Sequence, residues 1–352
     1  MKEFKRCKKC LMPSTRPGIE FNEEGICYPC VAFELRKKVD WEQRFKELEK
    51  LCDQYRKMEG YDCLITVSGG KDSMRQVQIM TEQMAMNPLC LMIDNFSWSE
   101  TGRKNYYNLS DRFGVELLCY TPNRKYMKYR VKEDFINHLH PARFWDELLY
   151  SIPHEYAKRF DIELVVWGEN PALEKGGLNL DDPENALRQL ESHRKLTDGD
   201  PNLRQFQLKS IFLDHYVPWS RYENIGFAMV NGLKTLDNLW DRQGYECFPF
   251  EQVDTVGYLV NEYAKYIKFG FGAMTELCSD AIRHKVMTRG EGLRRVRELD
   301  WKIDPLMVSD FCEGIGMKKE DFWYTITKHA NKDLLSYSLD DQRWKLREEY
   351  LV

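Results

Sequence analysis

The sequence predicts an α/β protein, with a parallel sheet covered by helices on both faces. Short apolar runs alternate with helix-like segments through the first two thirds of the chain, which is typical of parallel strands buried on both faces. Two CxxC pairs precede these runs, and the later part of the chain has a helical pattern. We therefore expect a cysteine knuckle at 1–35, a sheet domain at 36–235 and a mainly helical domain at 236–352.

Composition narrows the class of protein. The chain has 352 residues, 43% hydrophobic and 31% charged, with a formal net charge of −4. This balance gives no sign of nucleic-acid binding, and no apolar stretch approaches the roughly 18 residues of a membrane span. The first six residues are mostly charged and are followed by cysteines instead of an apolar signal segment, so we expect a cytoplasmic protein with no membrane partner.

The cysteine knuckle contains Cys7, Cys10, Cys27 and Cys30. Two CxxC pairs separated by 16 residues fall within the spacing of a structural zinc site. Four thiolates complete a closed tetrahedral shell around Zn²⁺, which allows a segment with almost no core to fold. A closed shell has no open coordination position, so we expect the zinc to serve structure or docking, not catalysis. Residues 31–58 then repeat apolar positions at helical spacing and predict one or two connecting helices.

The first predicted strand, 63–67, leads through Ser68-Gly69-Gly70-Lys71-Asp72-Ser73 into a helix that starts near Met74. A strand that turns through glycines into a helix presents unpaired N–H groups to an anion. Lys71 adds positive charge, Ser68 and Ser73 add hydroxyl donors, and Asp72 is suited to bind Mg²⁺. The spacing matches neither the Walker A motif nor the dinucleotide fingerprint. The alternative is an ordinary surface turn, but the flanking strand and helix favour a phosphate-binding loop.

Further strands are predicted at 89–93, 115–120, 162–167 and 211–219, with helices at 102–113 and over most of 124–159. Ligands of open α/β sheets bind beyond the carboxyl ends of the strands. We therefore expect four residues to face a bound nucleotide: Asp94, Asn95, Gly168 and Glu169. His138 and His140 have no matching cluster of ligands, so we interpret them as packed or surface residues.

Residues 172–208 are rich in Gly, Asp and Pro and contain few apolar positions. They form a long insert that is either disordered or a lid over the substrate, and we favour the lid.

From Thr255 the pattern is helical to the end of the chain and predicts a compact bundle. Lys268 and Arg283 lie in glycine-containing, mostly apolar stretches, from which they could reach the polyphosphate or an anionic substrate. Thr288 and Glu291 have the spacing of a capping box that opens a helix at 292–299. Gly292 is a poor helix former and weakens that prediction.

The SGGKDS loop at 68–73 resembles the SGGxDS loop of the N-type ATP pyrophosphatases, the PP-loop superfamily. A wider set of motifs is similar to the N-acetyl sugar amidotransferases: the cysteine knuckle, the loop, KFGFG at 268–272, DAIR at 280–283, TR at 288–289 and WKL at 344–346. These bacterial enzymes convert an acetamido group on a sugar to an acetamidino group, for O-antigen sugars or for nonulosonic acids such as pseudaminic or legionaminic acid on flagellin.

The resemblance implies ATP and Mg²⁺ as cofactors and cleavage of ATP to AMP and pyrophosphate. It makes Lys71, Asp72 and Ser73 the catalytic residues and assigns the whole SGGKDS loop to the polyphosphate. An amide oxygen is a poor leaving group, so adenylylation must precede attack by ammonia. No residue pattern of a nucleophilic catalyst is present, and none is needed.

Ammonia needs a source. A glutaminase requires a reactive cysteine, and the cysteines outside the knuckle stand singly in apolar or helical contexts: Cys52, Cys63, Cys90, Cys119, Cys247, Cys278 and Cys312. We therefore expect a separate glutaminase, and the resemblance points to a histidine-biosynthesis-like pair of glutaminase and cyclase subunits. Two alternatives are a tRNA-thiolating PP-loop enzyme, which requires a second cysteine cluster and a basic face, and a non-catalytic zinc-ribbon scaffold that retains the loop.

Overall fold

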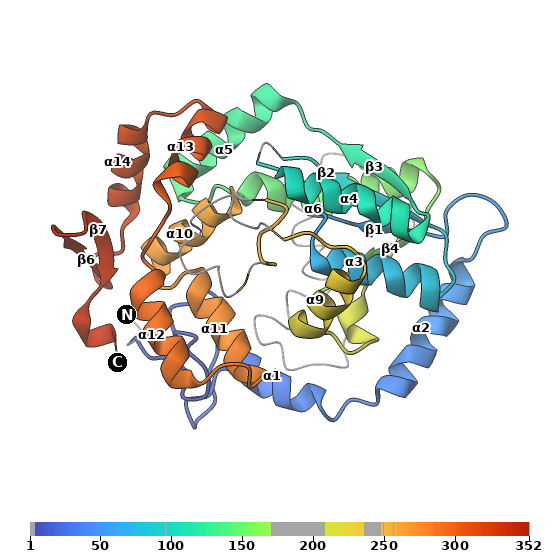
Figure 1. Cartoon of the computed structure of the whole chain (residues 1–352), viewed down its shortest axis with the longest axis horizontal. Helices are drawn as coiled ribbons and strands as arrows, with labels where there is room; N and C mark the ends of the chain where they lie inside the picture. The colour runs from blue at the N-terminus through green and yellow to red at the C-terminus, as the bar shows by residue number, and fades with distance from the viewer. Residues whose placement is uncertain are drawn as a thin grey trace.

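A computed structural model describes residues 4–95, 97–169, 208–235, 248, 250–255 and 257–351 (Figure 1). Within this part of the chain, five strands form one parallel sheet in the order β3-β2-β1-β4-β5. The strands are β1 (Cys63–Thr66), β2 (Pro88–Ile93), β3 (Glu116–Tyr120), β4 (Leu164–Trp167) and β5 (Lys209–Phe212). The predicted parallel α/β fold is confirmed.

Helices cover both faces of this sheet because successive strand residues point to opposite sides. From β1, Leu64 packs in one hydrophobic cluster with Ile152 of α6 (Arg143–Arg159). The next residue, Ile65, packs in another cluster with Val77 of α3 (Lys71–Gln78) and Leu109 of α4 (Glu100–Phe113). A π-helical turn, Ile79–Gln83, extends α3, and α9 (Arg221–Val230) packs against it.

The strand order places β1 at the centre of the sheet, with β2 on one side and β4 on the other. The chain moves outward from β1 through β2 to β3 and later crosses to β4 and β5. The segments that follow β1 and β4 therefore diverge at a topological switch point, which is where open α/β sheets bind ligands. The SGGKDS loop follows β1, and Gly168 and Glu169 follow β4.

The fifth strand is shorter than predicted. The sequence suggested 211–219, but β5 ends at Phe212 and a 3₁₀ turn (Leu213–His215) follows. In this turn, the Arg36 guanidinium donates a 2.9 Å hydrogen bond to the Asp214 carbonyl oxygen and lies 3.6 Å from its carboxylate. The apolar and aromatic composition of this segment therefore reflects burial in a turn.

The N-terminal knuckle is followed by α1 (Tyr28–Arg36) and α2 (Trp41–Tyr55), so the connecting segment contains two helices. After the sheet, the predicted helical region contains α10 (Tyr258–Phe269), α11 (Ala273–Arg283), α12 (Arg289–Leu299), α13 (Pro305–Ile315) and α14 (Lys319–His329). A hairpin of β6 (Leu335–Ser338) and β7 (Arg343–Leu346) follows, where only helices were expected. A single 3₁₀ turn, Glu348–Tyr350, comes after it.

The C-terminal helices share their core with α5 (Arg124–His138) from the sheet region (Figure 1). The Phe135 ring of α5 stacks on Phe322 at 5.0 Å and meets Phe311 edge-on at 5.3 Å. The two ends of the described chain also meet, because the Phe4 ring lies 5.0 Å from Tyr350.

The structure describes the helix predicted at 292–299 but not most of the insert predicted at 172–208. Thr288 caps α12 as expected, since its hydroxyl accepts from the Glu291 N–H at 3.2 Å, but the helix begins at Arg289 instead of 292. The insert predicted at 172–208 lies, up to residue 207, outside the described residues. No helix among those described has both the length and the apolar character needed to cross a bilayer.

Candidate functional site

The SGGKDS loop forms the tight turn from β1 into α3. Gly69 has φ +91°, and a Cβ there would lie 2.4 Å from the Gly102 carbonyl oxygen of α4, so glycine is required. The turn is held internally, because the Ser68 N–H donates to Ser73 Oγ at 2.8 Å. No side chain caps α3 at Gly70, which leaves the N–H groups of its first turn for a ligand.

The loop opens onto a cavity of about 490 Å³, a volume suited to a small molecule. We call it the loop cavity. It is lined by Val67, Ser68, Gly70, Lys71, Asp72, Met92, Ile93, Asn95, Trp145, Asp146, Leu149, Glu169, Phe250, Glu251, Gln252, Val253, Asp254, Thr255 and Tyr258. The carboxyl ends of β1, β2 and β4, helix α6 and a segment more than 150 residues beyond the loop thus contribute to one space.

Charged side chains of the loop are paired. Lys71 Nζ lies 2.7 Å from Asp72 Oδ2 and 3.3 Å from Glu251 Oε1. Burial by itself would lower the pKa of Lys71, but these two carboxylates raise it above its ordinary value. Burial would likewise raise the pKa of Asp72, but the Lys71 ammonium and a 2.8 Å hydrogen bond from Asn224 hold it below its ordinary value. Both side chains are therefore charged at neutral pH.

Beyond Glu251 the charges continue as a chain. Glu251 Oε1 lies 2.9 Å from the Arg221 guanidinium, whose Nε lies 3.3 Å from Asp280 Oδ2. Asp280 also pairs with Arg283 at 3.2 Å. Glu251 lines the loop cavity, whereas Arg221, Asp280 and Arg283 line a second cleft. We call the three residues Glu251, Arg221 and Asp280 the charged partition.

Of the four residues predicted to face a nucleotide, Asn95 and Glu169 line the loop cavity, whereas Asp94 and Gly168 do not. Asn95 lines the loop cavity, and its Nδ2 donates to Thr255 Oγ1 at 3.0 Å. Asp94 is buried and bound to Arg124 at 2.6 Å, and it is not among the residues that line the cavity. A Cβ at Gly168 would lie 2.6 Å from Gln76 Nε2, so glycine allows β4 to approach α3.

Two predicted contacts lie away from the loop cavity. The Lys268 ammonium, at the end of α10, donates to the His138 carbonyl oxygen at 3.4 Å and lies over the Phe269 ring. Arg283 lies beside the cysteine knuckle, with Nη1 4.0 Å from Cys10 Sγ. Neither side chain lines the loop cavity.

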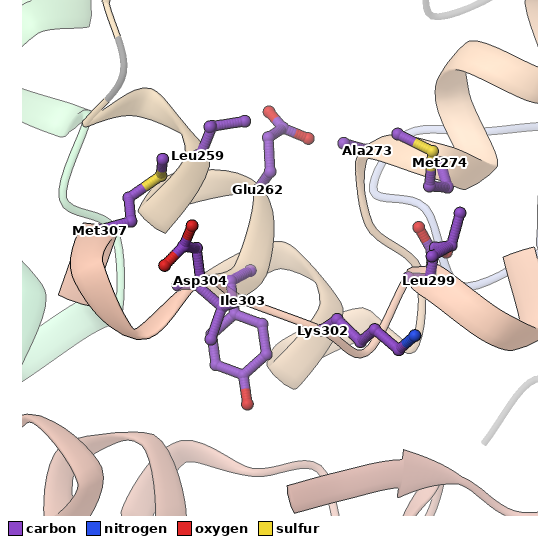
Figure 2. A pocket seen from close by; sticks show the side chains of 11 residues that line it. Leu259, Glu262, Ala273, Met274, Leu299, Lys302, Ile303, Asp304 and Met307 are labelled. Atoms are coloured by element: carbon purple, nitrogen blue, oxygen red, sulfur yellow. The ribbon is translucent and has the colours of Figure 1, made fainter. Parts of the chain in front are cut away.

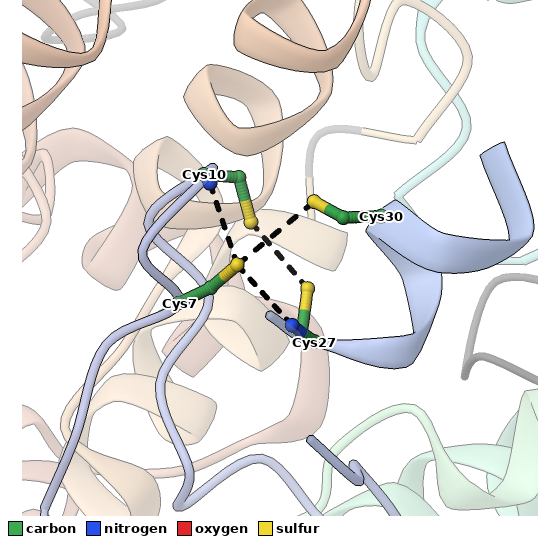
Figure 3. Close-up of side chains that lie close together, drawn as sticks. All are labelled: Cys7, Cys10, Cys27 and Cys30. Atoms are coloured by element: carbon green, nitrogen blue, oxygen red, sulfur yellow. Dashed lines mark hydrogen bonds between the residues drawn. The ribbon is translucent and has the colours of Figure 1, made fainter. Parts of the chain in front are cut away.

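The cysteine knuckle brings its four thiols together in a buried group (Figure 3). All four Sγ atoms lie within 4.8 Å of one another, with Cys10 to Cys27 at 3.6 Å and Cys7 to Cys30 at 4.0 Å. Tetrahedral zinc with bonds of about 2.3 Å requires sulfur separations of about 3.8 Å, so this donor set fits zinc.

A much smaller cavity, about 50 Å³, lies among α10, α11 and α13 (Figure 2). Glu262 points into it, and burial, opposed by Lys265, raises the pKa of this carboxyl to about 7. The cavity is too small for a nucleotide or a sugar.

Comparison with known proteins addresses the C-terminal part of the chain. Residues 242–350 match a family model described as "LPS biosynthesis protein WbpG-like, C-terminal domain". The C-terminal region is WbpG-like. This match confirms, over that region, the family resemblance inferred from the sequence.

Other similarities are more distant. The chain is 24% identical over 269 residues to "Uncharacterized protein MJ1599" of Methanocaldococcus jannaschii, covering 74% of this chain and 91% of that protein. Two of the solved structures that are similar to the chain each cover about half of it. An NH3-dependent NAD synthetase from Campylobacter jejuni is 13% identical, with a TM-score of 0.29, and covers 48% of this chain and 93% of its own. A predicted subunit of a tRNA methyltransferase from Methanocaldococcus jannaschii is 16% identical, with a TM-score of 0.29. The match covers 47% of this chain and 75% of that structure's chain.

The WbpG-like region completes the loop cavity, because Phe250 to Thr255 and Tyr258 line it together with the SGGKDS loop. Sequence reasoning missed Glu251 and Asp254 in this segment, as well as Arg221 and Asn224 on the first turn of α9. Burial raises the pKa of Asp254, and the Ser68 hydroxyl partly offsets that rise. None of the four belongs to a spaced motif. The one available signal was the i, i+3 spacing of Arg221 and Asn224, which places them on one face of a helix.

Proposed function

We propose that this protein is an ATP-dependent amidotransferase that converts an acetamido group of a sugar to an acetamidino group, in the biosynthesis of a bacterial surface glycan such as an O-antigen or a flagellin nonulosonic acid. One observation carries the proposal: the SGGKDS loop and the WbpG-like region line the same cavity. A loop of the phosphate-binding type and a region similar to a lipopolysaccharide biosynthesis domain thus line one cavity.

The proposed reaction has two steps. The amide oxygen of the sugar attacks the α-phosphorus of ATP, the bond to the β-phosphate breaks, and pyrophosphate leaves. Ammonia then adds to the activated carbon, and the C–O bond to AMP breaks to leave the amidine. The first step requires stabilisation of the charge that develops on pyrophosphate.

The loop supplies groups suited to this stabilisation. The first-turn N–H groups of α3 and the hydroxyls of Ser68 and Ser73 would donate to the phosphates. Lys71 is charged and already inside the cavity, so it would neutralise the leaving group with little reorganisation. Asn95 is the candidate contact for the adenosine, whereas Asp94 would act by holding Arg124.

Asp72 would hold Mg²⁺ at the polyphosphate. Its carboxylate lines the loop cavity in the ionised form, and carboxylate oxygens are preferred ligands of this cation. The ion would supply charge neutralisation on the phosphates. The contact between Asp72 and Lys71 at 2.7 Å would then exchange for contacts to the nucleotide.

Ammonia would come from a separate glutaminase with a cyclase-like subunit. Among the described cysteines outside the knuckle, all but Cys119 are buried. Burial raises the pKa of Cys52 to about 12 and that of Cys312 to about 11, which makes both poor nucleophiles. Turnover of glutamine by this chain alone would refute the proposed partner, whereas high ammonium without a partner should support the reaction.

The decisive experiment incubates the purified protein with ATP, Mg²⁺, ammonium and diacetamido sugars, both free and linked to a nucleoside diphosphate. Mass spectrometry should show the amide-to-amidine change of about one mass unit, and the nucleotide products should be AMP and pyrophosphate. Release of ADP and phosphate would exclude the proposed chemistry. A non-catalytic scaffold would form neither product, and a tRNA-thiolating enzyme would act only when tRNA replaced the sugar.

A further inference from the structure

A second cleft of about 440 Å³ adjoins the loop cavity, with the cysteine knuckle and α1 on its other side. We call it the knuckle cleft. Its walls come from segments far apart in the chain: the knuckle, α1, the start of α2, the segment that leads into α9, and α11. The reaction proposed above assigns no substrate to this cleft, although its volume is in the range of small-molecule sites.

Three aromatic side chains line the knuckle cleft: Phe33, Trp41 and Trp219. All three remain partly exposed. Each is also held in place by a neighbour, because Phe33 meets the His284 ring edge-on at 4.8 Å, Arg36 lies over Trp41, and the indole N–H of Trp219 donates to Glu169 at 3.2 Å. Fixed aromatic faces in a polar cleft provide platforms for the C–H face of a sugar ring.

The charged groups of the cleft also suit a polyhydroxylated ligand. Cations and carboxylates alternate as ion pairs, including Arg36 with Asp214 at 3.6 Å and Arg16 with Glu276 at 3.5 Å. A polyphosphate would meet as many carboxylates as cations here. Sugar hydroxyls both donate and accept, so they can bind to guanidinium and carboxylate groups in the same cleft.

The position of the cleft connects it to the loop cavity. Glu169 lines both spaces, and the charged partition separates them, with Glu251 on the loop side and Arg221 on the cleft side. A ligand in the cleft that extends past Glu169 would therefore reach the space next to the loop. Trp219 lies at this passage, since it binds Glu169 directly.

We propose that the knuckle cleft is the subsite for the acceptor sugar: the ring packs against Trp41 and Trp219, and its acetamido group extends past Glu169 toward the nucleotide. This inference rests on the proposed function, because it names the place of the second substrate. It also gives the cysteine knuckle a role, since the knuckle contributes Met12 and Pro29 to the cleft wall.

The test compares Trp41→Ala and Trp219→Ala in the full-length, zinc-loaded protein, with Trp41→Phe as the conservative variant. Losing an aromatic platform should raise KM for the diacetamido sugar about 10-fold, whereas KM for ATP should stay within about twofold. Trp41→Phe should recover most of the sugar affinity. Tyr324→Ala is the matched control, because this tyrosine is 72% exposed on α14 and lines neither cavity.

A binding measurement on the wild-type protein does not depend on turnover or on the folding of a variant. Saturation-transfer NMR with the same diacetamido sugar should show binding, and saturating AMP should leave that signal in place because the sugar ring and the nucleotide would occupy different cavities. Displacement of the sugar by AMP would place it in the loop cavity and overturn the inference.

The two proposals fail in different ways. Amidine formation with an unchanged sugar KM in both tryptophan variants would overturn the sugar subsite and retain the proposed reaction. Sugar binding that the tryptophan variants abolish, without any AMP or amidine in the wild type, would overturn the reaction and retain the subsite.

Discussion

The cysteine knuckle and the SGGKDS loop both depend on short sequence motifs, but the residues that contact each motif lie at very different distances along the chain. All four knuckle thiols come from residues 7–30. The loop receives a hydrogen bond to Asp72 from Asn224, 152 residues away, and Lys71 pairs with Glu251. The knuckle can therefore form locally, whereas the electrostatics of the loop require the complete fold.

Helix α11 connects these two regions. Arg283 approaches Cys10 Sγ at 4.0 Å, and Asp280, one turn earlier, pairs with Arg221 of the charged partition. The Leu11 N–H also donates to Ser279 Oγ at 3.2 Å. Loss of the knuckle structure should therefore disturb the knuckle cleft more than the loop cavity.

The largest effect is expected from loss of zinc. The purified protein should contain one Zn²⁺, and Cys27→Ser should lower the free energy of unfolding by about 5 kcal/mol, because the knuckle has little core besides the metal. ATP affinity should change much less. Metal analysis and denaturant unfolding provide the measurements. Absence of zinc, or the absorption band of an iron–sulfur cluster, would contradict the assignment.

In contrast to Cys27→Ser, Asp72→Ala should have a large effect on the reaction rate and a small effect on the free energy of unfolding. We expect kcat to fall on the order of 10²-fold, roughly 3 kcal/mol, because the carboxylate acts mainly in the transition state. ATP binding measured by calorimetry should weaken less than kcat falls. Full activity in this variant would mean that Asp72 does not take part in the reaction.

Asn224→Ala tests whether the distant partner matters. Removing its 2.8 Å hydrogen bond to Asp72 should lower kcat about 10-fold, since the carboxylate loses a donor that orients it. Asn108→Ala is the matched control, because Asn108 donates to the Asn231 carbonyl oxygen and lines neither cavity. Equal activity of the two variants would mean that Asp72 is oriented by the loop alone.

The smallest effect is expected where α12 meets the knuckle. A Cβ at Gly292 would lie 3.0 Å from Leu11 Cδ1 and 3.0 Å from Ile282 Cδ1, so Gly292→Ala should cost about 1 kcal/mol of stability. Gly290→Ala, in the same helix, has open space around its Cβ and should stabilise the protein by up to about 1 kcal/mol. Urea unfolding that showed the same sign for both variants would contradict this packing.

Gly292 is a poor helix former, and its contacts with Leu11 and Ile282 explain why a glycine lies in α12. Judged by propensity, the glycine weakens α12, but in the structure it lets the helix pack closely against the knuckle residue Leu11. Propensity describes an isolated segment, and here packing overrides it. Composition likewise favours a longer β5, but in the structure a turn that Arg36 contacts at Asp214 follows Phe212.

The sequence by itself determined strands β1 to β4 of the sheet, the SGGKDS turn and the cysteine knuckle. Each depends on a local pattern: an apolar run, a pair of glycines before a helix, or a fixed spacing of thiols. Tertiary structure alone decided the partners of Lys71 and Asp72, the pairing of Asp94 with Arg124, the position of Arg283 beside the knuckle, and the existence of the knuckle cleft. Charged side chains interact through space, so their partners can come from any part of the chain, and no local period or spacing in the sequence records the choice.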